Sequence, residues 1–428
     1  MRLLCSSPNL TDQDKKDLDR FSKYAIPTNV IGMKGDPESA RFINRALVLK
    51  GLKSTESHSR AALARQLGLS KITISQIVAD LIAEGLIEET GEGSPRSTGG
   101  RKPILLTLSS SSRFVMGLDI GLTNTVVALA GLKGERLVQF RVPTNAKHDI
   151  QSILAQVDDL VGAALAKQNV SKDRIAGVGI SIGGLIESQN GLIAFSPDFG
   201  WQDIPFRSLM ESRLKMPVTI DNCTRAMAFG EKWQEKSHDS ENIFYINLGY
   251  GIGSAIVMHG RIYNNNSEFG HIRITNKDVL CDCGKKGCLE AIASGHAIER
   301  TANALIPKKA VDDHYTAKDV AEMALAGNEV ARQIFRDASR YLGRAISIAA
   351  TLFDPDRVVI AGGVASAREL IEEPLMEEYN ALTLEVIKKS TPVTFSSFGM
   401  DAGIIGAISL ALNKYIFHEE ATIAASTG

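Results

Sequence analysis

One pattern occurs twice in this chain: an apolar strand, a glycine turn and a second apolar strand. The first copy covers residues 114–129 with its turn after Asp119, and the second covers residues 243–257 with its turn at Gly249. Two such copies predict a duplicated α/β architecture of two lobes with a cleft between them. Glycine in these turns lets backbone N–H groups approach a phosphate, but it suits an ordinary hairpin as well. The pattern therefore predicts the fold class and leaves nucleotide binding open.

The length of 428 residues is too great for one compact core, so two or three domains are expected. Apolar residues make up 44% and charged residues 23% of the chain, which is ordinary for a soluble globular protein. No run reaches the roughly 18 to 20 apolar residues that cross a bilayer, and residues 1–30 lack a secretory pattern. The net charge of -1 indicates no particular partner. These features predict a cytoplasmic protein without a membrane partner.

Three of the five cysteines lie within eight residues, and a histidine precedes the first of them by ten residues. In a cytoplasmic chain such clustering favours metal binding over disulfides. Three thiolates and one imidazole complete the tetrahedral shell of a zinc ion, and Gly284 and Gly287 permit the sharp turns that this requires. One structural zinc per chain is predicted, with three reduced thiols in a loop as the alternative. The predicted ligands are His271, Cys281, Cys283 and Cys288.

The amino-terminal part changes character at about residue 38. Residues 1–37 show no sustained periodicity and are expected to form an extension. Residues 38–108 predict a winged helix-turn-helix that binds DNA. Its three helices are expected at residues 43–49, at residues 59–67 and from residue 70 onward, and its two wing strands at residues 86–89 and 104–108.

Local signals support this motif. Gly68 suits the left-handed end of the second helix, and Ser70 can cap the third. Polar side chains at the start of the third helix would face the major groove, and the basic stretch between the wing strands would lie along a phosphate backbone or in a minor groove. Any three small helices can resemble this motif, and a basic stretch can be a solvated linker. The predicted DNA contacts are Ser70, Lys71, Thr73, Ser75 and Gln76 in the third helix and Arg96, Arg101 and Lys102 in the wing.

Residues 38–417 resemble the ROK family, named for repressors, open reading frames and kinases. The motifs that carry the resemblance are the cysteine segment ending in Glu290, the Glu-x-Gly-His element at residues 268–271, the segment at residues 195–201 after a Gly-Gly turn, and residues 354–363. The resemblance implies a two-lobed actin/hexokinase-like ATPase fold behind the winged domain. The first lobe is expected at residues 109–231, and the second, with the zinc site and a carboxy-terminal helix, at residues 232–428.

The resemblance also implies a sugar site, because family members that bind sugar hold its hydroxyls with matching residues. Carboxylates and an amide suit vicinal hydroxyls, and the histidine can face the metal with one nitrogen and the sugar with the other. Two of these residues have alternative roles, since Glu290 could simply begin a helix and Asn222 could be a turn residue. The implied sugar contacts are Gly184, Asn222, Glu268, His271 and Glu290.

The chain departs from the kinases of this family at the position of the general base, which is Cys223. Loss of a general base costs about 10²- to 10⁴-fold in rate, and the neighbouring carboxylates of Glu268 and Glu290 are expected to keep the thiol protonated. The phosphate turns also depart from the kinase pattern, with Leu122 and Asn124 in the first and Tyr250 in the second. Phosphoryl transfer is therefore expected to be lost, and no catalytic residue is predicted.

Together these features predict a sugar-responsive transcriptional regulator, most simply a repressor of carbohydrate uptake or catabolism genes. Its expected partners are operator DNA and a small sugar, and it is expected to form a homodimer or a dimer of dimers on a palindromic operator. Two alternatives remain: an active sugar kinase with an appended DNA-binding domain, and a regulator controlled by a protein partner.

Overall fold

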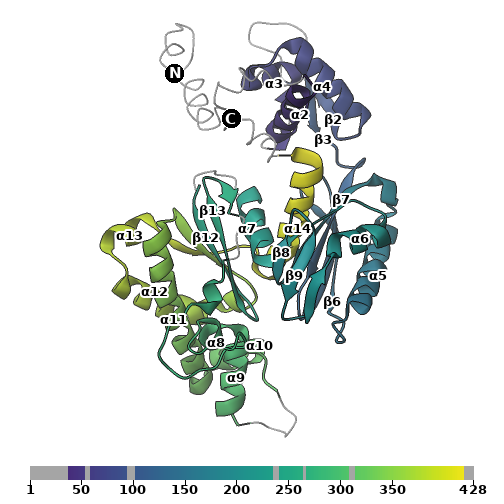
Figure 1. The fold of residues 1–428 in the computed structure, drawn as a ribbon. Coiled ribbons are helices and arrows are strands. Elements are labelled where there is room, and N and C mark those ends of the chain that lie inside the picture. The colour runs from purple at the N-terminus through teal and green to yellow at the C-terminus, as the bar shows by residue number, and fades with distance from the viewer. Residues whose placement is uncertain are drawn as a thin grey trace. The chain divides into compact units, whose positions relative to one another are not determined.

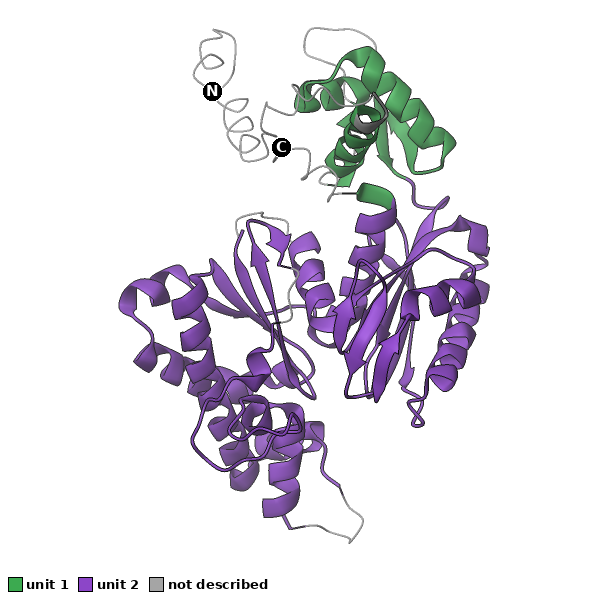
Figure 2. Cartoon of the chain, viewed as in Figure 1, with its two compact units in different colours: residues 1–108, 416–428 green, residues 109–415 purple. Residues whose placement is uncertain are grey.

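The computed structural model describes residues 37–53, 58–93, 102–234, 241–263, 267–307 and 314–418, which form two compact units (Figures 1 and 2). Unit 1 holds the chain up to Leu108 together with the chain from Ile416 onward, and unit 2 holds Ser109–Tyr415. Of the predicted DNA contacts, Arg96 and Arg101 lie outside the described residues, as does the expected extension up to residue 36.

The described residues of unit 1 form three helices and a small antiparallel sheet with the strand order β1-β3-β2. The helices are α2 (Pro37–Lys53), α3 (Arg60–Leu67) and α4 (Lys71–Ala83), and the strands are β1 (His58–Ser59), β2 (Ile87–Glu92) and β3 (Ile104–Leu108). The predicted caps are present: Ser59 accepts a bond from the Ala62 N–H, Gly68 has a φ of 65°, and Ser70 accepts from the Thr73 N–H. The helix-turn-helix and its wing strands are therefore confirmed.

The end of the chain completes unit 1. Ile416 and Phe417 are 2% and 1% exposed, and the Lys53 ammonium lies 5.8 Å from the centre of the Phe417 ring. The rings of Phe42 and His418 are 4.8 Å apart. This differs from the expectation that the second lobe extends through residue 428. The physical reason is that the Phe417 ring is buried and that Phe417 and His418 contact Lys53 and Phe42 of α2.

Unit 2 contains two five-stranded sheets with equivalent topology. In each sheet a central antiparallel hairpin is extended on one side by two parallel strands. The first sheet has the order β11 (Val218–Asn222), β7 (Ile175–Ile182), β4 (Phe114–Ile120), β5 (Asn124–Ala130), β6 (Arg136–Pro143); the second has the order β14 (Arg261–Ile262), β13 (Ile252–Met258), β12 (Ile243–Leu248), β15 (Arg357–Ala361), β16 (Val393–Phe395). The hairpins β4–β5 and β12–β13 are the two copies of the sequence pattern, so the predicted duplication is confirmed.

A third, three-stranded sheet and ten helices complete unit 2 among the described residues. The sheet has the order β10 (Trp201–Ile204), β9 (Leu192–Ser196), β8 (Leu185–Glu187). The helices are α5 (Ile150–Gln168), α6 (Phe206–Leu214), α7 (Cys223–Gln234), α8 (Glu290–Ala293), α9 (Gly295–Leu305), α10 (Ala317–Leu325), α11 (Glu329–Phe353), α12 (Arg368–Leu382), α13 (Glu385–Ser390) and α14 (Ala402–Leu412).

Helix α14, yellow in Figure 1, packs on β4, β7 and α7 of the first lobe. The carboxy-terminal helix was expected in the second lobe, and this expectation was wrong because the apolar helix buries its surface on the first sheet. Glycines permit this close approach, since a Cβ at Gly179 would lie 2.0 Å from the carbonyl oxygen of Ala407. The segment Gly399–Phe417 is long and apolar enough to cross a membrane by length and composition, but 72% of its most apolar window is buried inside the fold. Its apolar character is accounted for by this packing.

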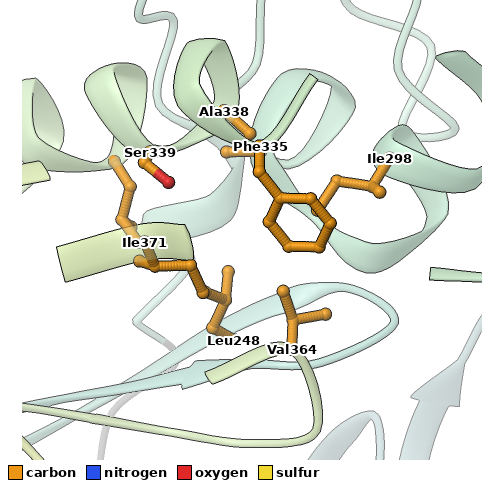
Figure 3. Close-up of a pocket in the computed structure, with 9 residues that line it drawn as sticks. Leu248, Ile298, Phe335, Ala338, Ser339, Val364 and Ile371 are labelled. Atoms are coloured by element: carbon orange, nitrogen blue, oxygen red, sulfur yellow. The ribbon is translucent and has the colours of Figure 1, made fainter. Parts of the chain in front are cut away.

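The second lobe has a tightly packed apolar core between its sheet and helices α8 to α12. A cavity of about 10 Å³ remains in it, lined by side chains that include Leu248, Phe335 and Ile371 (Figure 3). Such a volume holds about one water molecule. This cavity is therefore too small to hold a sugar.

Candidate functional site

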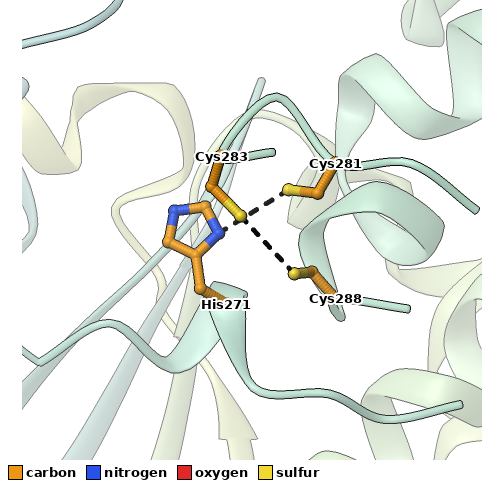
Figure 4. A group of neighbouring side chains, drawn as sticks. All are labelled: His271, Cys281, Cys283 and Cys288. Carbon is orange, nitrogen blue, oxygen red and sulfur yellow. Dashed lines mark hydrogen bonds between the residues drawn. The ribbon is translucent and has the colours of Figure 1, made fainter. Parts of the chain in front are cut away.

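Four side chains of the second lobe converge on one point (Figure 4). The Cys281 Sγ lies 3.7 Å from the His271 Nδ1, and the Cys283 Sγ lies 3.7 Å from the Cys288 Sγ. All four potential ligand atoms lie within 4.8 Å of one another. Two sulfurs bound to one zinc ion at about 2.3 Å in a tetrahedron are about 3.8 Å apart. The residues predicted as ligands thus lie together, with donor types and spacing that fit a tetrahedral metal ion.

Local backbone geometry explains how the cysteine loop reaches this arrangement. Gly284 and Gly287 have φ values of 83° and 76°, which side chains rarely adopt. The Cys281 N–H donates to the Lys285 carbonyl at 2.8 Å, and the Gly284 N–H donates to the Cys281 carbonyl at 2.9 Å. A Cβ at Gly287 would also lie 2.3 Å from the Thr275 carbonyl oxygen. The two glycines are therefore required by the turn, as the sequence pattern indicates.

The other nitrogen of His271 faces two carboxylates. Its Nε2 lies 3.9 Å from the Glu268 Oε2 and 3.9 Å from the Glu290 Oε1. Glu290 is the first residue of the four-residue helix α8, and its Oε2 accepts a bond from the Ile252 N–H at 2.8 Å. Glu290 thus begins a helix, and its bond to Ile252 also connects the cysteine loop to the second glycine turn. Three of the residues implied as sugar contacts, Glu268, His271 and Glu290, therefore lie together.

Asn222 and Gly184 form a second group. The Asn222 Nδ2 donates to the Gly184 carbonyl at 2.8 Å, while its Oδ1 accepts from the N–H groups of Thr224 and Arg225 at the start of α7. Gly184 has a φ of 125°, and a Cβ there would lie 2.7 Å from the carbonyl oxygen of Phe195. Asn222 therefore caps a helix and braces the Gly-Gly turn, so contact with a sugar is not its only role.

Cys223 is partly buried at the first turn of α7. Burial, followed by the neighbouring carboxylate of Asp119 and with a further contribution from Asp198, raises the pKa of its thiol to about 12. The raised pKa agrees with the expectation of a protonated thiol. The expected cause was wrong, because the sequence analysis attributed the raised pKa to Glu268 and Glu290 and not to Asp119 and Asp198. The difference arises because β4 and the loop before β10 bring Asp119 and Asp198 toward α7, which spacing along the chain does not reveal.

Asp119, Asp198, His148 and His296 were not predicted as site residues. Burial, and then the carboxylates of Glu290 and Asp282, raise the pKa of Asp198, while His148 lowers it. The ring of His296 lies 5.0 Å from that of Tyr250, and its Nε2 lies 3.9 Å from the Asp282 Oδ2. A signal was available for two of them, because Asp119 ends the first strand of the repeated pattern and Asp198 lies in the segment 195–201.

In unit 1 the predicted contacts of α4 lie at its amino-terminal end. Lys71, Ser75 and Gln76 are exposed, whereas Thr73 is half-buried and its Oγ1 lies 2.8 Å from the Ser70 Oγ. Ile72 is 81% exposed beside them and was not predicted, although an apolar side chain there can contact a thymine methyl. The Lys102 ammonium lies 3.2 Å from the Glu92 carboxylate across the wing.

The family model that matches this chain is described as the ROK family and covers residues 115–414. The chain belongs to the ROK family. The Xylose repressor of Caldicellulosiruptor bescii is 28% identical over 90% of this chain and 99% of its own length. The crystal structure of a ROK family transcriptional regulator, a homologue of the E. coli MLC protein, aligns with a TM-score of 0.75 and 25% identity over 90% of this chain and 100% of its own.

A kinase of the ROK family is also similar, over a shorter part of the chain. The ROK family glucokinase of Streptomyces griseus, solved with glucose and AMPPNP, aligns with a TM-score of 0.61 and 28% identity over 69% of this chain and 98% of its own. Similarity to the ROK regulators thus extends over nine-tenths of the chain, whereas similarity to this glucokinase covers about two-thirds of it.

Proposed function

We propose that this protein is a sugar-responsive transcriptional repressor. The observation that carries the proposal is the winged helix-turn-helix of unit 1, which presents exposed polar side chains at the amino-terminal end of α4 in the same chain as a ROK unit. Similarity to repressors over almost the whole length supports it. A protein that binds operator DNA must be in the compartment that holds the chromosome, so a cytoplasmic location is part of this proposal.

The amino-terminal end of α4 enters the major groove, and the wing follows the backbone or the minor groove. A homodimer or a dimer of dimers places two copies of α4 in successive major grooves of a palindromic operator. Ile72 adds an apolar contact. The proposed DNA contacts remain Ser70, Lys71, Thr73, Ser75, Gln76, Arg96, Arg101 and Lys102.

In unit 2, one zinc ion bound by the four clustered residues holds the loops that carry Glu268 and Glu290. These two carboxylates and the His271 Nε2 bind hydroxyl groups of the sugar, with Asn222 and Gly184 as further contacts. Binding closes the two lobes of unit 2, and this change is transmitted to unit 1. A coupling free energy of about 1 to 3 kcal/mol is the expected scale.

The proposal includes the loss of kinase activity. A kinase of this family needs a base at the position of Cys223, and a thiol with a pKa of about 12 stays protonated at neutral pH. Loss of the base costs about 10²- to 10⁴-fold in rate. Because the chain is similar to a glucokinase, residual phosphoryl transfer is the first alternative function. The second alternative is a regulator controlled by a protein partner.

The decisive experiment measures the affinity of the zinc-loaded protein for its own upstream DNA at fixed salt, with and without a panel of monosaccharides, amino sugars and their phosphates. One sugar is expected to change the affinity, and Glu290→Ala to remove that response while DNA binding remains. Glu322→Ala, the same change on α10 in an exposed residue, should keep the response. Equal DNA binding with every sugar would favour a protein partner, and ATP-dependent phosphorylation without DNA binding would establish a kinase.

A further inference from the structure

We propose that helix α4 reads A·T base pairs in the major groove and does not read guanine. Ile72 contacts the methyl group of a thymine, and Gln76 bonds the edge of a nearby adenine. This inference rests on the proposed function, because it names the bases that the same helix recognises. Two observations carry it: an exposed isoleucine that takes no part in the core of unit 1, and an outward helix face without a charged side chain.

The isoleucine is Ile72, at the amino-terminal end of α4. Its side chain is 81% exposed, and no other large apolar side chain in the described part of the chain is as exposed. The opposite face of α4 carries the side chains that enter the core, which are Ile74, Ile77, Val78 and Leu81. Single exposed apolar side chains are common on protein surfaces, so the neighbours of Ile72 on its own face decide what it can do.

The outward face of α4 continues from Ile72 with uncharged residues. Gln76 and Ala79 follow Ile72 at four and seven positions, spacings that put the three side chains on one side of the helix. All three are exposed. Within the described residues no hydrogen bond occupies the Gln76 amide. This amide can therefore both donate and accept a bond at the edge of a base.

The charges on and beside α4 lie away from this face. Asp80 pairs with Arg41 of α2 at 2.6 Å, and Glu84, directly after the helix, pairs with Arg45 of α2. Lys71, the first residue of α4, points about 100° away from the outward face, which suits a contact with the phosphate backbone. The outward face thus presents an apolar side chain and an amide to the groove.

These two residue types match A·T pairs. In the major groove thymine presents a C5 methyl group, which an apolar side chain contacts, and adenine presents N6 and N7, which the amide of glutamine bonds together. Guanine is read by arginine or lysine through O6 and N7, and the outward face carries neither. The four positions between Ile72 and Gln76 span about 6 Å of helix. The two side chains therefore reach different base pairs of one half-site.

The test compares natural and base-modified copies of the protein's own upstream DNA, bound by the full-length, zinc-loaded protein. Amplification with dUTP removes the thymine methyl groups, 7-deaza-dATP removes adenine N7, and 7-deaza-dGTP removes guanine N7. All these groups lie in the major groove, so minor-groove contacts of the wing are not altered directly. Burial of one apolar carbon is worth about a fourfold change in affinity, and uracil DNA should bind more weakly by about that factor or more. Adenine-modified DNA should also bind more weakly, whereas guanine-modified DNA should bind like natural DNA.

Each of the two side chains has its own variant. Ile72→Ala should bind thymine and uracil DNA with affinities that agree within about twofold, because the methyl group has lost its partner. Ile82→Ala is the matched control, since it makes the same change in an exposed isoleucine near the other end of α4, and it should keep the preference for thymine. Gln76→Ala should remove the sensitivity to 7-deaza-adenine and keep the preference for thymine.

Equal affinity of the unmodified protein for thymine and uracil DNA overturns this inference while the proposed function stands. A preference for thymine that survives Ile72→Ala overturns the role of Ile72, and a sensitivity to 7-deaza-adenine that survives Gln76→Ala overturns that of Gln76. Weaker binding of guanine-modified DNA overturns the restriction to A·T pairs. If the natural upstream DNA is not bound at all, the proposed function itself fails and the inference fails with it.

Discussion

At the scale of single residues, Asp119 shows how an acidic group can be retained at a cost in stability. It accepts a bond from the Ser181 hydroxyl at 2.7 Å and packs so closely on α14 that a Cβ at Gly403 would lie 2.3 Å from its Oδ2. Burial raises its pKa to about 6 in spite of the bond from Ser181. The folded state therefore holds a proton on Asp119 between about pH 4 and 6, where the unfolded chain has lost it.

This shift predicts that Asp119→Asn stabilises the protein at neutral pH. Because the folded pKa is raised, the stabilising contribution of the protonated group is present at low pH and is lost as the pH rises through about 6. The ionised carboxylate then costs about 2 to 3 kcal/mol, which asparagine avoids while still accepting a bond from Ser181. Thermal melts should show a higher Tm for the variant at pH 7.5 and little difference at pH 4. Equal stabilisation at both pH values would contradict this explanation, and Asp158→Asn serves as control.

The metal cluster gives a second prediction at this scale. Cys283→Ser should abolish stoichiometric zinc binding, because a serine hydroxyl does not replace a thiolate in a four-ligand site. Cys223→Ser is the matched control, since Cys223 lies outside the cluster. Metal analysis of the purified variants should find about one zinc per chain in the control and far less in Cys283→Ser. Retention of zinc by Cys283→Ser would exclude Cys283 as a ligand.

At the scale of elements, helix caps determine where α3 and α4 begin. Ser59 and Ser70 each accept a bond from a backbone N–H of the following turn, at 3.2 and 3.0 Å. Ser59→Ala and Ser70→Ala should each lower the free energy of unfolding by about 1 kcal/mol. Only Ser70 belongs to the proposed DNA surface, so Ser70→Ala should weaken operator binding more than Ser59→Ala at equal stability. Equal loss of affinity in titrations with labelled DNA would remove Ser70 from that surface.

The contact of α14 with β7 gives another prediction for elements. Gly179→Ala would drive a methyl group into the Ala407 carbonyl, and overpacking of this kind costs about 1 to 3 kcal/mol. Gly162→Ala makes the same change in α5, where nothing lies within 4 Å of the new Cβ, and should stabilise the protein by up to about 1 kcal/mol. Denaturant unfolding should show the two variants moving in opposite directions. A neutral Gly179→Ala would mean that α14 can shift on the sheet at little cost.

At the scale of the whole molecule, unit 1 is built from both ends of the described chain. Phe417→Ala should cost about 3 to 5 kcal/mol in unit 1, because Phe417 is 1% exposed there. Phe335→Ala removes an equally buried ring from the second lobe of unit 2. Calorimetry should show Phe417→Ala lowering the melting transition that operator DNA stabilises, and Phe335→Ala lowering the one that zinc stabilises. If Phe417→Ala leaves both transitions unchanged, the chain end is not part of unit 1 in solution.

Features set by neighbours along the chain could be predicted from the sequence. The caps at Ser59 and Ser70, the left-handed Gly68 and the cysteine loop all depend on contacts within a few residues, where residue type and spacing decide the geometry. The repeated strand–turn–strand pattern likewise predicted the two equivalent sheets, since each of its strands is an apolar run that is buried almost throughout. The family resemblance added the expectation of two lobes, but it did not place α14, which packs on β4, β7 and α7.

Tertiary structure alone decided what surrounds these local features. Asp119 and Asp198 lie near Cys223 because sheet order brings β4 and the loop before β10 toward α7, although the three residues are far apart in the sequence. In the same way, Phe417 is buried in unit 1. The N–H groups of Gly295 and His296 at the start of α9 donate to the carbonyls of Gly249 and Tyr250. Such contacts depend on which segments pack together, and this is determined by burial over the whole chain rather than by the residues on either side.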